Sequence, residues 1–549
     1  MTSDLDRARP DVRPTAKAAS PERQGERRSS SASLRRSWEW AALLLLALAG
    51  ALMMAHLTRK GIGLWEDSFD YITAARSLVE SGRLGRIDGF GNFRPLTHFP
   101  PAYPWALALL NLAGIDIYDA ARWLNVGLYG AVILLSGAGL RWAAGSVVWG
   151  LMGAGLVLSS EVLIGVHLWA LTEPLYLALA LGAILLAAGY LGNPGRRGFL
   201  HLAAFTSAFA LLTRYAGAAT VITVALALAT LPGRARARKW QDALVFLMIS
   251  CLPLLAFMAR NRIISGAPID YPRAAWHWPP ASEWEVAART LLNWGLPDVV
   301  VEHLSGRTAL AVSCVWGFLS FLGAVWLLRR LRRDLRAKAE VGSAIGILFP
   351  LYGGAYLLVF LASGILVRTV VLTDTRLLAP LYVALAAILV TALAQVWRNA
   401  AFAGRMLVVG LCVVIAGFQV WRLSGLVEVL PGDSRGFASN AWRQSETIAF
   451  LRTLPQTTIY SNEIQTIYFL TGITGIFVPT PDNPATDQPR EDYADSLAEM
   501  RLAIHRDEGV LALFASPEEF ESEYFRALAE GLTLLGRFSD GAVLGNGDA

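Results

Sequence analysis

The chain has 549 residues, of which 54% are hydrophobic and only 17% charged, and its mean hydropathy is +0.44. Such a composition excludes a purely soluble protein, whose solvated surface needs more polar residues. The formal net charge of +5 does not indicate nucleic-acid binding, because Lys and Arg cluster in short loops between apolar runs, where membrane insertion uses them. Cys251, Cys314 and Cys412 stand inside apolar runs without ligand-like spacing, which argues against a disulfide framework or a zinc site.

The first 36 residues are rich in Arg, Ser, Ala and Pro and have no apolar face. This composition predicts a disordered basic tail in the cytoplasm. The first apolar run begins at Trp38 and has no small-residue cleavage site, so we expect it to remain as a membrane anchor.

Eleven apolar runs follow one another along residues 37–425, and they lack the alternation of barrel strands. They predict an α-helical polytopic membrane protein with about eleven transmembrane helices. The predicted spans are 38–57, 119–141, 146–166, 170–191, 199–213, 216–231, 241–261, 308–328, 343–367, 376–396 and 403–422.

Basic loops give the orientation of these spans. With eleven crossings, every basic loop falls on the cytoplasmic side, as the positive-inside rule requires: Arg141, Arg196 with Arg197, residues 234–239, residues 329–338, and Arg398 with Arg405. A twelfth crossing at 101–114 would break this rule, so that stretch is predicted to be a helix at the outer interface. The N-terminus is then cytoplasmic, and the loops 58–118 and 262–307 are periplasmic, in a multi-pass protein of the cell inner membrane.

The last part of the chain, residues 431–549, differs in character from the rest. Charged helical patterns at 439–453, 491–506 and 517–529 alternate with short apolar runs at 457–460 and 510–514. This alternation predicts a small soluble α/β domain on the periplasmic side.

The first external loop opens with Trp65-Glu66-Asp67-Ser68-Phe69-Asp70-Tyr71 and continues as an amphipathic helix. In a structural interpretation Asp67 caps this helix and Asp70 stands in its first turn. In a functional interpretation Asp67 is a general base held over the membrane. The spacing alone allows both.

Glu173, Arg214 and Arg376 stand at the external ends of three predicted spans. An ionisable group near the hydrocarbon edge is costly unless it is paired or hydrated, so three at one depth indicate a polar cavity. The alternative is that each side chain reaches separately to the interface.

Loop 262–307 and its flanks are rich in aromatic and basic residues, which serve either as interface anchors or in sugar stacking and phosphate binding. These are Arg260, Arg262, Tyr271, Arg273, Trp276, His277 and Trp278. His98 and His277 lack the paired spacing of metal ligands. No cofactor is indicated, and the residues leave a divalent metal ion open.

Three motifs together resemble a known superfamily. They are an acid followed by a tyrosine and an alanine in the first loop, the HFPPAYP stretch from His98 to Pro104, and the helix start Ala121-Arg122-Trp123-Leu124-Asn125. This combination is similar to GT-C glycosyltransferases, in particular the protein mannosyltransferases and lipid A aminoarabinose transferases (glycosyltransferase family 39). The layout agrees over roughly residues 38–400, with weaker echoes around Glu173, Arg214 and Arg376.

The resemblance implies an inverting transfer of sugar from a polyprenyl-phosphate donor to a lipid, glycan or protein acceptor. Many members carry Asp-Glu where this chain has Glu66-Asp67; aligning the tyrosine favours Asp67 as the base, with Glu66 as the alternative. Donor-binding residues implied or indicated by position are Arg122, Glu173, Arg214, Arg260, Arg262, Arg376, His98 and Tyr103. A secondary transporter or lipid flippase is the rival, but the sequence shows neither broken helices nor a two-halves repeat.

Overall fold

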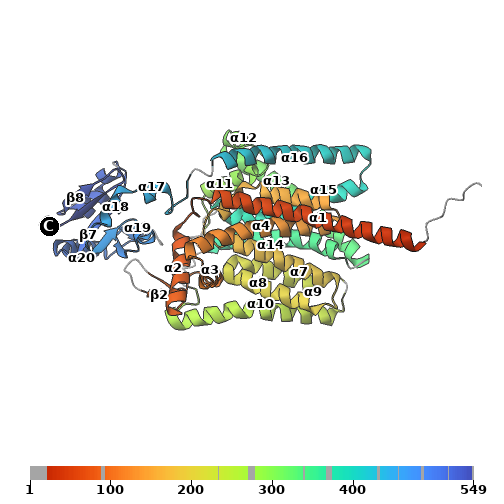
Figure 1. The fold of residues 1–549 in the computed structure, drawn as a ribbon, viewed down its shortest axis with the longest axis horizontal. Coiled ribbons are helices and arrows are strands. Elements are labelled where there is room, and N and C mark those ends of the chain that lie inside the picture. The colour runs from red at the N-terminus through yellow and green to blue at the C-terminus, as the bar shows by residue number, and fades with distance from the viewer. Residues whose placement is uncertain are drawn as a thin grey trace, which may run out of the picture.

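The computed structural model describes residues 21–546 except 88–92, 233, 270–277, 338–339, 367–373, 430–432, 456, 484–487 and 517. Long helices run side by side along the long axis of the molecule, and a small α/β unit lies beyond one end of them (Figure 1). That end also carries α2 and α3, and we call it the capped end. Tyr271, Arg273, Trp276 and His277 lie outside the described residues.

Apolar helices form the bundle, because an apolar run in lipid must satisfy its backbone hydrogen bonds internally. In chain order they are α1 (Pro21–Leu57), α4 (Ile117–Ala144), α5 (Val147–Leu158), α6 (Glu161–His167), α7 (Glu173–Gly192), α8 (Arg197–Thr213), α9 (Ala218–Thr230), α10 (Arg236–Ser265), α13 (Gly306–Ala337), α14 (Val341–Leu366), α15 (Ala379–Asn399) and α16 (Phe402–Val429). Two 3₁₀ turns, η1 (Tyr215–Gly217) and η2 (Thr375–Leu378), lead into α9 and α15.

Each of the eleven predicted spans coincides with an apolar helix or helix pair. Within the described residues, eight helices are long and apolar enough to cross a membrane, and a bent pair, α5 with α6, makes a ninth. The spans predicted at 199–213 and 216–231 are shorter apolar helices. The chain is therefore a multi-pass membrane protein.

Two features of the bundle differ from expectation. The first helix extends back to Pro21, so residues 21–36, predicted to be disordered, are helical. That segment has no proline after Pro21, which is itself favourable at a helix start, and its Glu, Arg and Ala residues tolerate a helix. A broken helix is also present, since α5 and α6 meet at 59° around Ser159 and Ser160.

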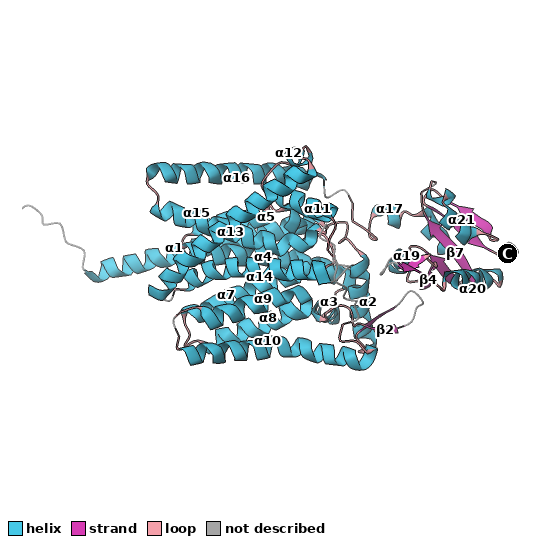
Figure 2. Ribbon diagram, turned by 180° about the vertical axis from the view of Figure 1, so that it is seen from behind, coloured by secondary structure: helices cyan, strands magenta, loops and turns pink. Residues whose placement is uncertain are grey.

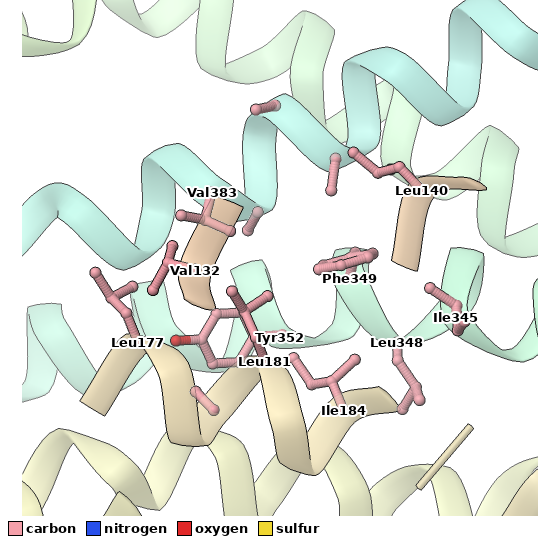
Figure 3. Packing of buried hydrophobic residues seen from close by; sticks show 14 of the residues in the cluster. Val132, Leu140, Leu177, Leu181, Ile184, Ile345, Leu348, Phe349, Tyr352 and Val383 are labelled. Carbon is pink, nitrogen blue, oxygen red and sulfur yellow. The ribbon is translucent and has the colours of Figure 1, made fainter. Parts of the chain in front are cut away.

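The bundle core is built where α4, α7, α14 and α15 meet. Figure 3 shows side chains from these four helices packed against one another, among them Val132, Leu181, Phe349 and Val383. By contrast only 6% of the residues in the most apolar stretch of α16 are buried, which leaves one side of this helix for lipid.

Between α1 and α4 the chain builds a compact external loop. It contains α2 (Glu66–Ser81), a hairpin of β1 (Gly85–Ile87) with β2 (Phe93–Pro95), and α3 (Ala102–Leu112). Tyr71, Tyr103 and Leu107 are buried between α2 and α3, which fixes α2 against the bundle. The second loop carries α11 (Ala281–Asn293) and α12 (Asp298–Glu302).

The C-terminal unit is a mixed α/β fold, as predicted. Figure 2 shows its strands and helices together beyond the end of the bundle. The sheet has the order β4-β3-β7-β9-β8; β3 pairs in parallel with β4 and β7, and β9 pairs antiparallel with both β7 and β8. The strands are β3 (Thr458–Ser461), β4 (Gly475–Phe477), β7 (Gly509–Phe514), β8 (Thr533–Arg537) and β9 (Gly541–Gly545), with a separate short pair β5 (Asp482–Asn483) and β6 (Gln488–Pro489). The helical segments are α17 (Asn440–Arg443), α18 (Glu446–Leu451), α19 (Ile464–Thr471), α20 (Tyr493–His505), η4 (Glu519–Glu521) and α21 (Glu523–Ala529).

Alternation along β7 explains the layers of this unit. Leu511 and Leu513 pack with α20 and α21, whereas Val510 and Ala512 pack with α18 and α19. Both faces of the sheet are therefore covered by helices, as a buried parallel strand requires.

Candidate active site

Asp67 is the second residue of α2, but it does not cap the helix. The N-cap is Trp65, whose backbone N–H donates to Ser68 Oγ at 3.0 Å. The Asp67 carboxylate instead forms an ion pair with Arg376, with 3.1 Å between Oδ2 and Nη2. The capping interpretation of Asp67 is therefore wrong, because the serine one residue later takes that role.

Arg376 lies at the centre of the cluster, in the turn η2. Its guanidinium contacts Asp67 and Asp374, and its Nε lies 3.7 Å from Glu173 Oε1. Asp374 also accepts from the backbone N–H of Arg376 at 3.2 Å, which fixes the turn. Burial raises the pKa of Asp374, against the opposing pull of Arg376.

Beneath Arg376 lies a buried ion pair. Arg214 Nη1 is 2.7 Å from Glu173 Oε1 and also donates to Thr172 Oγ1 at 2.7 Å. Glu173 is only 1% exposed. The structure thus brings Asp67, Glu173, Arg214 and Arg376 together from four separate segments, at the start of α2, the start of α7, the turn before η1, and η2.

Two further side chains of α2 border the cluster. Burial raises the pKa of the Tyr71 hydroxyl, and the carboxylates of Asp67 and Glu173 add to the rise, so Tyr71 remains a neutral hydrogen-bond donor. Asp70 is buried and accepts from Arg86 Nη1 with both oxygens, at 2.8 and 2.7 Å. Burial raises the pKa of Asp70 while Arg86 opposes the rise, and the pair ties α2 to the hairpin.

A cavity of about 590 Å³ lies beside the cluster, with Asp374 and Arg376 in its wall. Its volume is typical of small-molecule sites. Two edge-to-face aromatic pairs contribute to the wall, Trp65 with Trp169 and Trp294 with Tyr382. Polar lining comes from α6, α11 and α16, namely Ser160, Glu161, Thr290, Asn293, Gln419 and Arg422.

Asp374 and Arg422 were not among the site residues expected from the sequence. Arg422, near the end of α16, contacts Glu161 and lies 3.2 Å from Asp298 Oδ1. It also donates to the Asn293 carbonyl and so joins α6, α11 and α16 around the cavity. Asp374 carried a signal, since it stands two residues before Arg376. Arg422 carried none beyond its place at the end of a span.

Three arginines that were candidate donor ligands lie in other networks. Arg122 donates to Thr58 Oγ1 and the Ala55 carbonyl, where it closes the end of α1. Arg260 donates to the carbonyls of Leu84 and Leu96 and supports the hairpin. Arg262 donates to the Gly266 carbonyl at the end of its own helix.

The remaining candidates lie around α2. Glu66 is exposed, and burial together with the charge of Glu66 raises the pKa of Glu463. His98 stacks edge-to-face on Phe99 at 4.4 Å. Tyr103 is fully buried against Tyr71, and within the described residues its hydroxyl has no hydrogen-bond partner.

Within the described part of the chain, no three His, Cys, Asp or Glu side chains lie close enough together to hold a metal ion.

Asn125, from the helix-start motif, has a clear structural role. Its amide Nδ2 donates to the carbonyls of His167 at 3.1 Å and Trp169 at 2.7 Å. It thereby holds the segment that leads into Thr172 and Glu173.

Comparison with known proteins gives matches only among solved structures, since no protein-family model and no curated protein matches the chain. ArnT from Cupriavidus metallidurans in the apo state aligns with a TM-score of 0.56 and 14% identity, over 93% of this chain and 98% of that one. The same protein bound to undecaprenyl phosphate aligns with a TM-score of 0.57 and 13% identity, over 92% of this chain and 98% of that one. The Archaeoglobus fulgidus oligosaccharyltransferase, in complex with Zn and sulfate, aligns with a TM-score of 0.53 and 11% identity, over 91% of this chain and 73% of that one.

At such low sequence identity the alignments show a shared fold. They extend over both the helix bundle and the C-terminal unit, since each covers more than nine-tenths of this chain. The chain therefore has the fold of ArnT and of the archaeal oligosaccharyltransferase.

Proposed function

We propose that this protein is a glycosyltransferase that moves a sugar from a polyprenyl-phosphate donor to an acceptor hydroxyl, with inversion, at the capped end of the bundle. Support comes from the fold and from the lipids in related structures. ArnT has been solved with undecaprenyl phosphate, and the archaeal oligosaccharyltransferase AglB with dolichol-phosphate and an inhibitory peptide.

The observation that carries the proposal is the pairing of Asp67 with Arg376 beside the cavity. A base for the acceptor and a cation for the leaving phosphate are needed within a few ångströms of one anomeric carbon. Asp67 and Arg376 are such a pair. Asp67 is paired with Arg376 whereas Glu66 is exposed, which favours Asp67 as the base.

In the proposed reaction, Asp67 accepts the proton of the acceptor hydroxyl. The hydroxyl oxygen forms a bond to the anomeric carbon while the bond from that carbon to the phosphate oxygen breaks. Polyprenyl phosphate leaves with the bonding electrons and a charge of about −2. Arg376 is placed to stabilise it and Arg214 to hold the cluster, because charge-assisted hydrogen bonds from guanidinium groups suit phosphate oxygens.

Donor binding also changes the base in this scheme. Arg376 is shared among carboxylates in the free protein, and a phosphate oxygen competes for the same N–H groups. When phosphate takes the Nη2 donor, Asp67 loses its partner and becomes available as a proton acceptor. The donor thereby activates the base that the reaction needs.

The acceptor, whether lipid, glycan or protein, approaches from the side of the C-terminal unit in this proposal. The capped end is taken as the periplasmic face of the inner membrane, with residue 1 in the cytoplasm, because the basic loops all lie on the opposite side of the spans. The unit over 431–549 is proposed to tune acceptor access without supplying a catalytic acid.

The transporter alternative gains one feature from the structure, the break between α5 and α6. Transporters use broken helices at the membrane midplane to bind their cargo. Here residues at the break, Ser160 to Val162 with Gly165 and Val166, line the cavity next to η2 and α11, close to Asp374 and Arg376. This placement suits a donor site at the capped end better than a transport site.

A test of the proposal uses the full chain reconstituted in vesicles with a panel of polyprenyl-phosphate sugars. Mass spectrometry should detect sugar transferred to an acceptor for at least one donor, and Asp67→Asn should abolish that product. If no donor in the panel is consumed, while the protein moves polyprenyl phosphate between leaflets, the transporter alternative replaces this proposal.

A further inference from the structure

Three segments of the chain meet next to the residues that precede Asp67 and Glu173. Gly63 N–H donates to the Leu168 carbonyl at 2.8 Å, and Ala170 N–H donates back to the Gly63 carbonyl at 2.9 Å. This parallel bridge joins the segment leading into Asp67 to the segment leading into Glu173. The relative placement of the two acids is therefore set by backbone hydrogen bonds.

The third segment comes from beyond the last span. Leu64 N–H donates to the Arg435 carbonyl at 3.1 Å, and Phe437 N–H donates to the Leu64 carbonyl at 3.2 Å. Residues 434–438, which we call the strap, thus pair with the residue that precedes Trp65, the N-cap of α2. Ser434 adds a bond from its hydroxyl to the Ile62 carbonyl at 3.3 Å.

Gly436 makes this close pairing possible. Its φ is +57°, and a Cβ there would lie 1.9 Å from the Leu64 carbonyl oxygen and 2.8 Å from Trp169 Cζ3. A side chain at 436 therefore has to push away the start of α2 or Trp169. Trp169 in turn packs edge-to-face on Trp65.

The segment before α2 is also held by the body of the protein, and α2 itself contacts the C-terminal unit. Tyr118 of α4 donates to the Ile62 carbonyl at 2.6 Å, and Arg443 of α17 lies 3.5 Å from the Tyr118 hydroxyl. Further out, Tyr468 of α19 accepts from Arg76 at 3.3 Å and packs edge-to-face on Phe69. Both Arg76 and Phe69 belong to α2.

We propose that the strap is a positioning element of the active site, which fixes the start of α2 and with it the distance from Asp67 to Arg376. The inference rests on the proposed function of Asp67 and adds a role for the chain after the last span. The C-terminal unit, docked on α2 and joined to the strap, is thereby coupled to the chemistry as well as to acceptor access.

The test compares two left-handed glycines in the full chain. Gly436→Ala pushes on Leu64, whereas Gly472→Ala, at φ +76° with no atom within 4 Å of its Cβ, carries the same backbone penalty without a clash. A displacement of about 1 Å near a reacting group costs about a hundredfold in rate. We expect Gly436→Ala to lower kcat by about that factor and Gly472→Ala to stay within about threefold of the unchanged protein.

Donor binding separates positioning from misfolding. In Gly436→Ala the KM for the donor, and inhibition by unsubstituted polyprenyl phosphate, should stay within about threefold, because Arg214 and Arg376 are on other segments. The proposal is overturned if kcat is unchanged, if kcat and donor binding fall together, or if Gly472→Ala loses as much.

A gentler variant covers the case in which Gly436→Ala does not fold. Ser434→Ala removes the hydrogen bond from the strap to the Ile62 carbonyl, and about a fivefold drop in kcat at constant KM is expected, against no change if the strap is a passive connector. Asp67→Asn keeps the two claims apart. If it is active, the proposed base is wrong; if it is inactive while Gly436→Ala is fully active, only the strap proposal fails.

Discussion

The Arg376 guanidinium lies within ion-pair distance of three carboxylates, those of Asp67, Glu173 and Asp374. Glu173 is also held by Arg214, so three acids face two arginines. With all five groups ionised the cluster carries one more negative than positive charge, and both of its arginines are already paired with carboxylates. A phosphate ligand must therefore compete with carboxylates already in place, which makes its binding an exchange of partners.

Replacing Asp67 with Asn tests the proposed base. Asn cannot accept the proton, so transfer should fall by about a hundred- to ten-thousand-fold. The helix start should survive, because Ser68 satisfies the Trp65 N–H. Transfer assays with donor binding measured in parallel check this, with Glu66→Gln as the milder control. Inactive Glu66→Gln beside active Asp67→Asn would move the base by one residue.

The pair of Glu173 with Arg214 should behave as a unit. Glu173→Gln leaves the Arg214 charge buried beside a neutral group, and losing one partner of a buried ion pair costs about 3–5 kcal/mol. Thermal unfolding in detergent should show a large loss for Glu173→Gln and a smaller one for the double variant Glu173→Gln with Arg214→Gln. Equal losses in the two would contradict the pairing. Both variants should be poor enzymes.

The charge pattern predicted part of this site and missed part of it for a physical reason. Hydropathy fixes the depth of a residue in the membrane, and it placed Glu173, Arg214 and Arg376 correctly at one depth. It contains no information on the direction around the bundle axis. Arg260 shares that end of the bundle but faces the hairpin, and Arg422 faces the cavity, a difference that no spacing in the sequence encodes.

At the scale of elements, the bend between α5 and α6 was hidden in a continuous apolar run. The first helix ends at Leu158 with Ser159 as its C-cap, and Ser160 caps the second helix, accepting from Leu163 N–H at 3.4 Å. Serine in an apolar run is compatible with an unbroken helix as well, so its sequence predicted one span at 146–166. The helices with a single apolar run and charged ends, such as α7 and α10, were predicted to within a few residues.

Close packing of α5 on α4 gives a test at this scale. A Cβ on Gly150 would lie 2.7 Å from the Gly137 carbonyl oxygen and 2.8 Å from Arg141 Cβ, whereas one on Gly155 meets nothing within 4 Å. Gly150→Ala should therefore destabilise the protein by about 1–3 kcal/mol through overpacking. Gly155→Ala, on the same helix, should be neutral or more stable by up to about 1 kcal/mol. Thermal unfolding of the two variants in the same detergent measures this difference. Equal melting temperatures for Gly150→Ala and Gly155→Ala would contradict the close contact between α4 and α5.

For the whole molecule, the orientation in the membrane is the testable expectation. The eleven-span scheme puts Ala235 in the cytoplasm and Ala113, just after α3, outside; both residues are exposed. In a chain whose own cysteines are replaced, Ala113→Cys should react with an impermeant maleimide added outside, and Ala235→Cys only after the membrane is opened. Labelling of position 113 only from the cytoplasm would make α3 a crossing helix.

The residues of the site are synthesised at widely separated times. Asp67 and Glu173 are made early, Arg376 arrives 309 residues after Asp67 (376 − 67), and the strap follows the last span. Membrane domains assemble as the ribosome delivers them, N-terminal parts first. A nascent chain that has inserted α1 to α9 thus holds the proposed base and the buried ion pair but no Arg376. If the proposed function is right, incomplete chains stalled in the membrane would leave the carrier lipid intact.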